Sequence, residues 1–149
     1  MTPKITAYFI SGLGADRRAF QKIRLPDRFE IVHIDWSTPL KKETLRDYSL
    51  RLTEKINTGK PYIFIGLSFG GMVVTELTKQ LNPIQSIIIS SASNNKELPW
   101  YFKLIGLLGI HKLMPTKVLK LKNPFTFWLF GAETKEEKKL LAQILKDTD

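Results

Sequence analysis

The first ninety residues alternate between short apolar runs and longer segments whose apolar residues recur at helical spacing. The short runs are rich in β-branched or aromatic residues and end at glycine, proline or polar turns, as buried strands do. They cover residues 5–10, 29–34, 62–65 and 86–89. Nearly continuous apolar strands that alternate with helices favour parallel pairing, with both faces of the sheet covered. The pattern therefore predicts an α/β fold with an open, mainly parallel sheet flanked by helices.

Helical segments are predicted between these strands. Residues 15–23 form a short helix candidate after the first strand, and residues 37–39 open a second helix that ends at residues 57–59. The apolar face of this second helix repeats at i, i+3, i+7 and i+11, and consists of Leu45, Tyr48, Leu52 and Ile56. A third helix follows residues 62–65 and stops at Pro83. Its inward face consists of Met72, Val73, Leu77 and Leu81.

The pattern changes after the fourth strand. Residues 90–95 form a polar loop, and residues 98–149 contain helical segments without a convincing strand. Thr134 and Glu137 have the spacing of a helix-capping box. The helix that follows has an apolar stripe of Leu140, Leu141, Ile144 and Leu145. We therefore expect two parts, a strand-containing core over residues 1–95 and a helical region over residues 96–149.

The sequence Gly66-Leu67-Ser68-Phe69-Gly70 lies between the third strand and its helix. A sharp strand-to-helix turn of this kind holds its serine in a strained conformation at the carboxyl edge of the sheet. Side chains at 66 and 70 would collide with the neighbouring strand or helix, and Gly71 extends the close approach. Two glycines in a first helical turn cost about 1 kcal/mol each relative to alanine, so propensity alone does not explain them. The motif predicts Ser68 as a nucleophile; the alternative is a tight turn with an idle serine.

Two backbone amides are candidate donors to an oxyanion beside Ser68. The N–H of Phe69 lies at the start of the helix, where the helix dipole favours developing negative charge. The second is the N–H of Leu13, in the loop Ser11-Gly12-Leu13-Gly14 that ends the first strand. A phosphate-binding role for Gly12 and Gly14 is weaker, because a third glycine and a Walker lysine are both missing.

This combination resembles the α/β-hydrolase superfamily over about residues 4–95. The glycine loop follows the first strand, Asp35-Trp36 follows the second, and the Ser68 turn follows the third. Residues 96–149 resemble the start of the helical cap subdomain of that family. The resemblance implies a serine hydrolase that cleaves a carboxylic ester, thioester or amide through an acyl-Ser68 intermediate, without metal or cofactor. The alternative is a non-catalytic module that binds a small ligand on the same scaffold.

The chain departs from the family pattern at two places. Many members have His-Gly in the oxyanion loop, where this chain has Ser11. The family's catalytic acid and histidine follow the serine on later loops, so we expect both beyond residue 149 and a chain that is nearly inactive as it stands. His33 lies in the second strand and His111 in the helical region, and neither is assigned to catalysis. Asp35 precedes the serine and is not assigned either.

Composition narrows the possible partners. The chain has no cysteine, which excludes thiolate catalysis and cysteine-based zinc sites and fits a cytoplasmic protein. Its formal net charge is +9, but no nucleic-acid recognition motif accompanies the charge, and we interpret the lysines as solvated helix faces. No apolar window is long enough for a membrane-spanning helix.

An aromatic stripe in the helical region suggests the kind of substrate. It consists of Trp100, Tyr101, Phe102, Phe125, Phe127, Trp128 and Phe130. We interpret the stripe as the underside of a cap over an apolar pocket, which favours a small-molecule substrate with an apolar acyl group. The alternative is peripheral contact with an anionic membrane. A fragment that exposes its fourth strand as a sheet edge should also self-associate.

Overall fold

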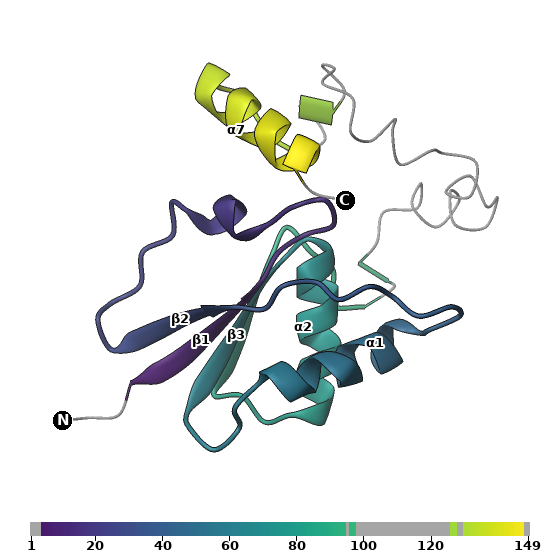
Figure 1. Ribbon diagram of the computed structural model, residues 1–149. Helices are drawn as coiled ribbons and strands as arrows, with labels where there is room; N and C mark the ends of the chain where they lie inside the picture. The colour runs from purple at the N-terminus through teal and green to yellow at the C-terminus, as the bar shows by residue number, and fades with distance from the viewer. Residues whose placement is uncertain (1–3, 95, 98–125, 128–129, 148–149) are drawn as a thin grey trace. The chain divides into compact units, whose positions relative to one another are not determined.

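The computed structural model describes residues 4–94, 96–97, 126–127 and 130–147. These residues belong to two compact units, Met1–Asn95 and Lys96–Asp149. The first unit contains the sheet and the two helices α1 and α2 (Figure 1). The second contains α7.

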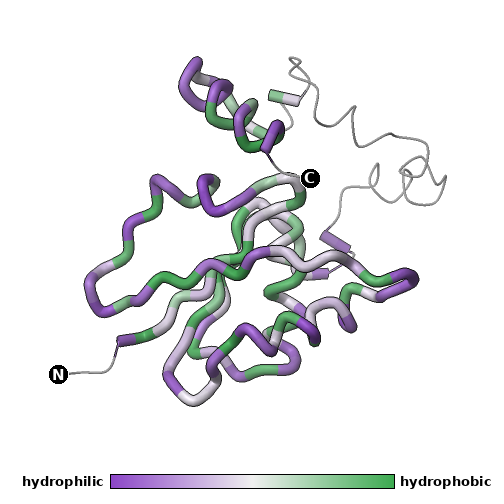
Figure 2. The backbone as a smooth tube through the Cα atoms, viewed as in Figure 1, coloured by the Kyte–Doolittle hydropathy of each residue, from purple (hydrophilic) through white to green (hydrophobic). Residues whose placement is uncertain are grey.

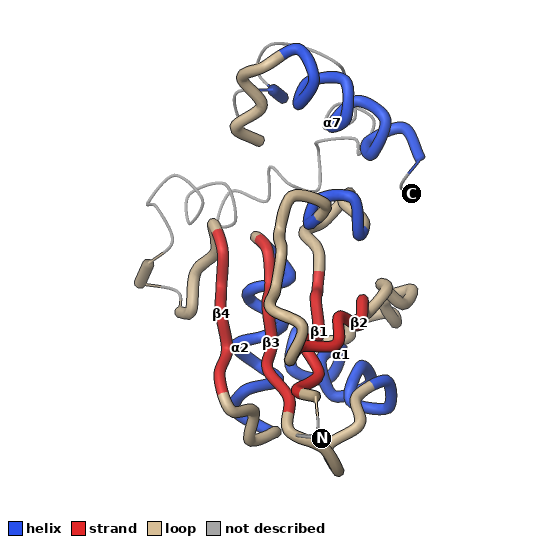
Figure 3. Tube along the Cα trace, turned by 90° about the vertical axis from the view of Figure 1, so that its left-hand side faces the viewer, coloured by secondary structure: helices blue, strands red, loops and turns tan. Residues whose placement is uncertain are grey.

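A parallel sheet forms the centre of the first unit, with the strand order β2-β1-β3-β4 (Figure 3). Its strands are β1 (Ile5–Ile10), β2 (Phe29–His33), β3 (Tyr62–Leu67) and β4 (Gln85–Ile89). In register, Phe9 of β1 lies between His33 of β2 and Ile65 of β3. All three strand pairs are parallel, so their carboxyl ends share one edge of the sheet. The predicted fold class is confirmed.

Alternate residues of the central strands pack into two separate cores. Figure 2 shows hydrophobic positions along the strands and along the helices that cover them. Tyr8 and Phe64 face helices α1 (Leu45–Leu52) and α2 (Phe69–Gln80). Phe9 faces the other side, where it packs against Phe20 of the short 3₁₀ helix η1 (Arg17–Phe20). Because side chains alternate between the faces of a strand, apolar residues at successive positions require cover on both sides. The continuous apolar runs in the sequence arise from this arrangement.

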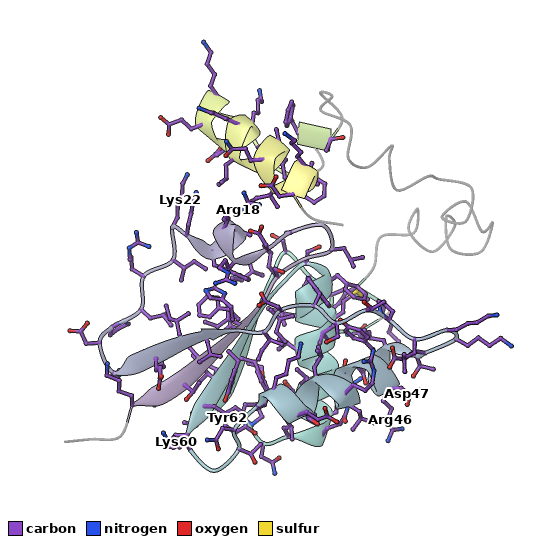
Figure 4. All side chains as sticks on the ribbon, in the orientation of Figure 1. Arg18, Lys22, Arg46, Asp47, Lys60 and Tyr62 are labelled. Carbon is purple, nitrogen blue, oxygen red and sulfur yellow. The ribbon has the colours of Figure 1, made fainter. Side chains whose placement is uncertain are left out.

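Two helix predictions need correction. α1 begins at Leu45 rather than at residues 37–39, and η1 is four residues long rather than a helix over 15–23. The N-terminus of α1 is set by Thr44, whose Oγ1 accepts a hydrogen bond from the N–H of Asp47 at 3.2 Å and donates to the Asp47 carboxylate at 2.6 Å. Figure 4 labels Asp47 at this end of the helix. This reciprocal cap places the helix start after the turn over residues 40–43.

Residues just before that turn are held extended by side chains from α1. The Tyr48 hydroxyl accepts from the N–H of Ser37 at 3.0 Å and donates to the Ser37 carbonyl at 2.9 Å. Arg51 donates to the Thr38 carbonyl at 3.0 Å. These contacts occupy backbone groups that a helix would need for its own bonds. A 3₁₀ turn, η2 (Thr53–Lys55), ends the helical segment before Asn57.

The second unit contains α7 (Lys135–Asp147), preceded by the predicted capping box. Glu137 N–H donates to Thr134 Oγ1 at 3.2 Å, and Thr134 N–H donates to the Glu137 carboxylate at 3.1 Å. Ile144 and Leu145 of the predicted stripe are buried. Of the aromatic stripe, Phe127 and Phe130 are described, and the other members lie outside the described residues. No helix within the described ranges has the length and apolar character needed to cross a membrane.

Candidate active site

Ser68 lies directly between β3 and α2 and has an unusual backbone conformation. Its φ is 53° and its ψ is −120°, outside the regions that non-glycine residues favour. Its side chain is exposed, and its hydroxyl makes no hydrogen bond within the described residues. Such backbone strain costs about 1–3 kcal/mol and persists only when the surroundings impose it. The conformation places a free hydroxyl at the carboxyl edge of the sheet.

Hydrogen bonds from two other segments hold this conformation. Ser68 N–H donates to the carbonyl of Ile89, the last residue of β4, at 2.8 Å. The Ser68 carbonyl accepts from Gly71 N–H at 2.9 Å and from the Ser91 hydroxyl at 2.6 Å. The backbone of Ser68 is therefore fixed from the neighbouring strand and from its own helix. Ser91 lies in the predicted polar loop over residues 90–95, where no motif marks it in the sequence.

The glycines of the turn allow backbone segments to touch. A β-carbon on Gly66 would lie 2.5 Å from the Gly70 carbonyl oxygen and 2.6 Å from the Gly71 α-carbon. A β-carbon on Gly70 would overlap the carbonyl oxygens of Ile10 and Ser11, and one on Gly71 would overlap the Ser91 side chain. A side chain at 66 or 70 has no space because its neighbours are backbone atoms. Each glycine requirement inferred from the motif has a steric cause here.

The loop after β1 lies beside Ser68. A β-carbon on Gly12 would lie 3.2 Å from the Ser68 β-carbon and 3.8 Å from its Oγ. Leu13 follows, with a side chain that is 61% exposed. Gly14 has a φ of 65°, and Ala15 N–H donates to the Gly12 carbonyl at 3.1 Å, which closes the turn. The structure thus brings together the two segments in which the sequence predicted oxyanion donors.

Both predicted donors have N–H groups that are free in the described part of the chain. Neither Leu13 N–H nor Phe69 N–H donates to an acceptor within residues 4–94. Phe69 is the first residue of the twelve-residue α2, so its N–H lies at the positive end of that helix. Amides with these properties suit an anion that forms at the Ser68 side chain. Their roles remain predictions.

His33, in β2, and Asp35, which follows that strand, do not belong to the cluster around Ser68. The His33 ring packs against the rings of Phe9 and Phe20, with centroids 5.5 and 6.0 Å away, on the face of the sheet opposite to α1 and α2. The Asp35 carboxylate lies 3.8 Å from the Arg17 guanidinium, and both side chains are exposed. Asp147 belongs to α7 in the second unit, and His111 and Asp149 lie outside the described residues.

His33 should make the stability of the first unit depend on pH. Burial lowers its pKa below the usual value of 6.5, Arg17 lowers it further, and Asp35 opposes them. A lowered pKa means that the folded state binds this proton less readily than the unfolded chain, so stability is lost as pH falls below about 6.5. We expect the thermal midpoint to fall between about pH 7.5 and about pH 5.5 by more in the unmodified protein than in His33→Gln. Differential scanning calorimetry of both proteins measures this, and equal pH dependence would contradict it.

Other features of the described residues offer no alternative centre of chemistry. No group of three or more histidine, aspartate or glutamate side chains within them is placed to hold a metal ion. A shallow hollow beside α2 is lined by Leu45, Met72, Thr75, Glu76, Lys79, Ala92, Ser93 and Asn94. Ser68 and Leu13 do not line it. The cluster around Ser68 is therefore the candidate site.

The chain is similar to known proteins in its structure rather than in its sequence. No protein-family model and no curated protein sequence matches the chain. Among solved structures, MenH from S. aureus is similar over 99% of this chain, with a TM-score of 0.67 and 17% identity. ClbQ from the colibactin NRPS/PKS pathway (TM-score 0.48, 20% identity, 96% of this chain) and BioG from Haemophilus influenzae (0.47, 14%, 97%) are also similar.

The similarity to MenH shows the fold. The chain spans 63% of the length of the MenH chain, and 64% and 67% of the ClbQ and BioG chains. MenH has the α/β-hydrolase fold. The chain therefore has a partial α/β-hydrolase core, with a parallel sheet flanked by helices, as the resemblance in its sequence implied.

Proposed function

We propose that this chain carries the nucleophile and the oxyanion hole of a serine hydrolase, with Ser68 as the nucleophile. The observation that carries the proposal is the backbone of Ser68, which has a positive φ and presents an exposed hydroxyl beside Gly12. Backbone strain of this kind is typical of functional sites, because elsewhere the chain relaxes to an unstrained conformation. Hydrogen bonds from β4, α2 and the Ser91 hydroxyl maintain it.

The reaction would follow the course of acyl transfer to serine. Ser68 Oγ attacks the carbonyl carbon of an ester, thioester or amide, and its proton passes to a general base. The carbonyl oxygen becomes an oxyanion that accepts from the Phe69 and Leu13 amides. Collapse of this intermediate breaks the bond to the alcohol, thiol or amine, which departs with the proton from the general base. The acyl group stays bound to Ser68 Oγ. Water then attacks the acyl carbon, releases the acid and restores the serine hydroxyl.

The substrate class in this proposal comes from the second unit. The aromatic residues between 100 and 130 favour an apolar acyl group over a sugar or a phosphate. Lys138 lies over the Phe127 ring at 6.0 Å, which shows a basic side chain beside an aromatic one in the described part of this unit. A carboxylic ester or thioester of an apolar acid is therefore the substrate that we would test first.

A second candidate function, ligand binding without catalysis, follows from the surroundings of the Ser68 hydroxyl. No histidine contacts its hydroxyl within the described residues, so the same scaffold could hold a small apolar ligand without chemistry. This candidate predicts binding of an apolar ligand with no covalent product. It differs from the first in whether Ser68 becomes modified.

Covalent labelling distinguishes the two functions. Because no base lies beside Ser68 within the described residues, we expect a fluorophosphonate probe to modify residues 1–149 at Ser68 only slowly, and faster when imidazole is added as an exchangeable base. Ser68→Ala should abolish the labelling. Ser90→Ala is the matched control, because Ser90 is also an exposed serine with a positive φ, of 47°. Intact-protein mass spectrometry followed by peptide mapping measures the modified fraction. Labelling that survives in Ser68→Ala, or that is absent with and without imidazole, would overturn the proposed hydrolase.

A further inference from the structure

The Ser11 hydroxyl connects the oxyanion loop to the loop after β2. Ser11 is 6% exposed. Its hydroxyl donates to the Ala15 carbonyl at 2.7 Å and accepts from Trp36 Nε1 at 3.0 Å. An indole N–H only donates and a carbonyl only accepts, so these two partners fix the direction of the hydroxyl proton. Ser11 thus connects the two ends of the turn that contains Leu13. Trp36, in the loop after β2, donates to the Ser11 hydroxyl.

Trp36 also reaches the segment that carries the other predicted donor. Its ring centroid lies 5.6 Å from that of Phe69, and both rings join the core on the α2 face of the sheet. A second contact, with the Tyr48 ring at 5.9 Å, supports Trp36 from α1. One side chain therefore touches Phe69 directly and the Leu13 turn through Ser11.

The oxyanion loop needs such a support because of its glycines. Gly12 and Gly14 flank Leu13, and glycine gives the chain more conformational freedom than any other residue. Within the described residues, the backbone bond that closes the turn is the one from Ala15 N–H to Gly12 O, at 3.1 Å. A loop with one backbone bond and two glycines would sample several directions of the Leu13 N–H. An oxyanion hole is effective when its donors are fixed before the reaction.

We propose that Trp36 and Ser11 are positioning residues that fix the direction of the Leu13 amide relative to Ser68. We call this pair the Trp36–Ser11 latch, and the inference rests on the proposed hydrolase function. The latch acts on the oxyanion and not on substrate binding. Its loss should therefore slow acylation of Ser68 without weakening the initial complex.

The first test separates the rate of labelling from the affinity for the probe. Trp36→Phe keeps a ring beside Phe69 and Tyr48 and removes the N–H that reaches Ser11, together with part of the indole ring. We expect it to lower the first-order labelling constant of Ser68 by about 10-fold, less than the ~100-fold that follows removal of a whole oxyanion donor, with the half-saturating probe concentration unchanged. Tyr48→Phe is the matched control, since it loses both hydrogen bonds to Ser37 and none to Ser11. Its labelling constant should stay at the unmodified value.

A double-mutant cycle tests whether the two residues act as one unit. Ser11→Ala also loses the bond to the Ala15 carbonyl, so it should slow labelling at least as much as Trp36→Phe. The double variant should label no more slowly than Ser11→Ala alone, because the second change removes a bond that is already lost. Additive effects would contradict the latch. Equal losses in Trp36→Phe and Tyr48→Phe would overturn it as well, because they would indicate general loosening of the core.

Amide hydrogen exchange keeps this result distinct from that of the proposed function. Exchange at Ala15, whose N–H donates to the Gly12 carbonyl, should become faster in Trp36→Phe than in Tyr48→Phe, whether or not Ser68 reacts. If the unmodified protein is labelled and the variants behave alike, the latch is wrong and the hydrolase stands. If the unmodified protein is not labelled at all, the hydrolase and the catalytic purpose of the latch both fail. Unchanged exchange at Ala15 would exclude the latch as a structural tie.

Discussion

Residues 1–149 should hydrolyse p-nitrophenyl esters about 10⁶-fold more slowly than a serine hydrolase with a complete triad. A serine hydroxyl is a weak nucleophile until a base takes its proton. The Ser68 hydroxyl has no such partner within the described residues, and the His33 ring packs against Phe9 and Phe20 on the face of the sheet opposite to α1 and α2. The oxyanion amides and the fixed serine would remain, and they leave a residual rate above that of water.

Steady-state release of p-nitrophenol from a short apolar acyl ester measures this rate, with Ser68→Ala as the background. We expect the two proteins to differ little, because neither has a base beside residue 68 within the described residues. An ordinary enzymatic rate in the unmodified protein would contradict the expectation. In that event His111→Ala and His33→Gln, compared under the same conditions, would identify the base.

The strands could be predicted closely from the sequence because their signal is local and redundant. Each predicted run lies within two residues of the observed strand at both ends, as in residues 62–65 against Tyr62–Leu67. Both faces of the sheet are covered, so nearly every residue of a central strand must be apolar. In an α/β chain, a short apolar run bounded by turn residues therefore indicates a buried strand.

The start of α1 could not be predicted in the same way. Serine, threonine and proline at 37–39 have the composition of a helix start, yet the helix begins at Leu45. The reason lies in contacts that local composition does not encode, namely the bonds from Tyr48 and Arg51 to the backbone of Ser37 and Thr38. Side chains that return from a later turn of the helix override the local preference.

The candidate site also has features that the sequence predicts and features that it does not. The glycine pattern around Ser68 is contiguous in sequence, so its steric purpose could be inferred from the motif. The bond from Trp36 to Ser11 joins residues 25 positions apart, and the bond from Ser91 to Ser68 joins residues 23 apart. Neither pair has a periodicity or a spacing that marks it. Such contacts depend on the order of the strands in the sheet, which the structure supplies.

Gly70→Ala should unfold the first unit or destabilise it by about 3 kcal/mol or more, the upper end of what overpacking costs. Alanine normally stabilises a helix by about 1 kcal/mol relative to glycine, so propensity alone predicts the opposite sign. The steric term decides the outcome because the new β-carbon would overlap the carbonyl oxygens of Ile10 and Ser11. Both atoms belong to the backbone, and Ile10 is the last residue of β1, which pairs with β2 and β3, so the Ile10 carbonyl cannot withdraw without disturbing the sheet. Urea unfolding followed by far-ultraviolet circular dichroism measures the loss.

Alanine substitutions at two further glycines test whether the loss of stability follows the steric overlap. A β-carbon from Gly71→Ala would overlap Oγ and Cβ of Ser91 and would lie 3.3 Å from the Gly66 carbonyl oxygen. Rotation clears only Oγ, so the loop at Ser91 must shift and lose its bond to the Ser68 carbonyl. Because Ser91 lies in a loop after β4, this substitution should be less destabilising than Gly70→Ala. Gly59→Ala is the matched control on the surface, where the nearest atom is the Asn57 side-chain oxygen at 3.2 Å, and it should change the unfolding midpoint little. If Gly70→Ala were as stable as Gly59→Ala, β1 and α2 would not approach each other as closely as the structure shows. Ser68 would then lose the close packing that holds its turn against the oxyanion loop.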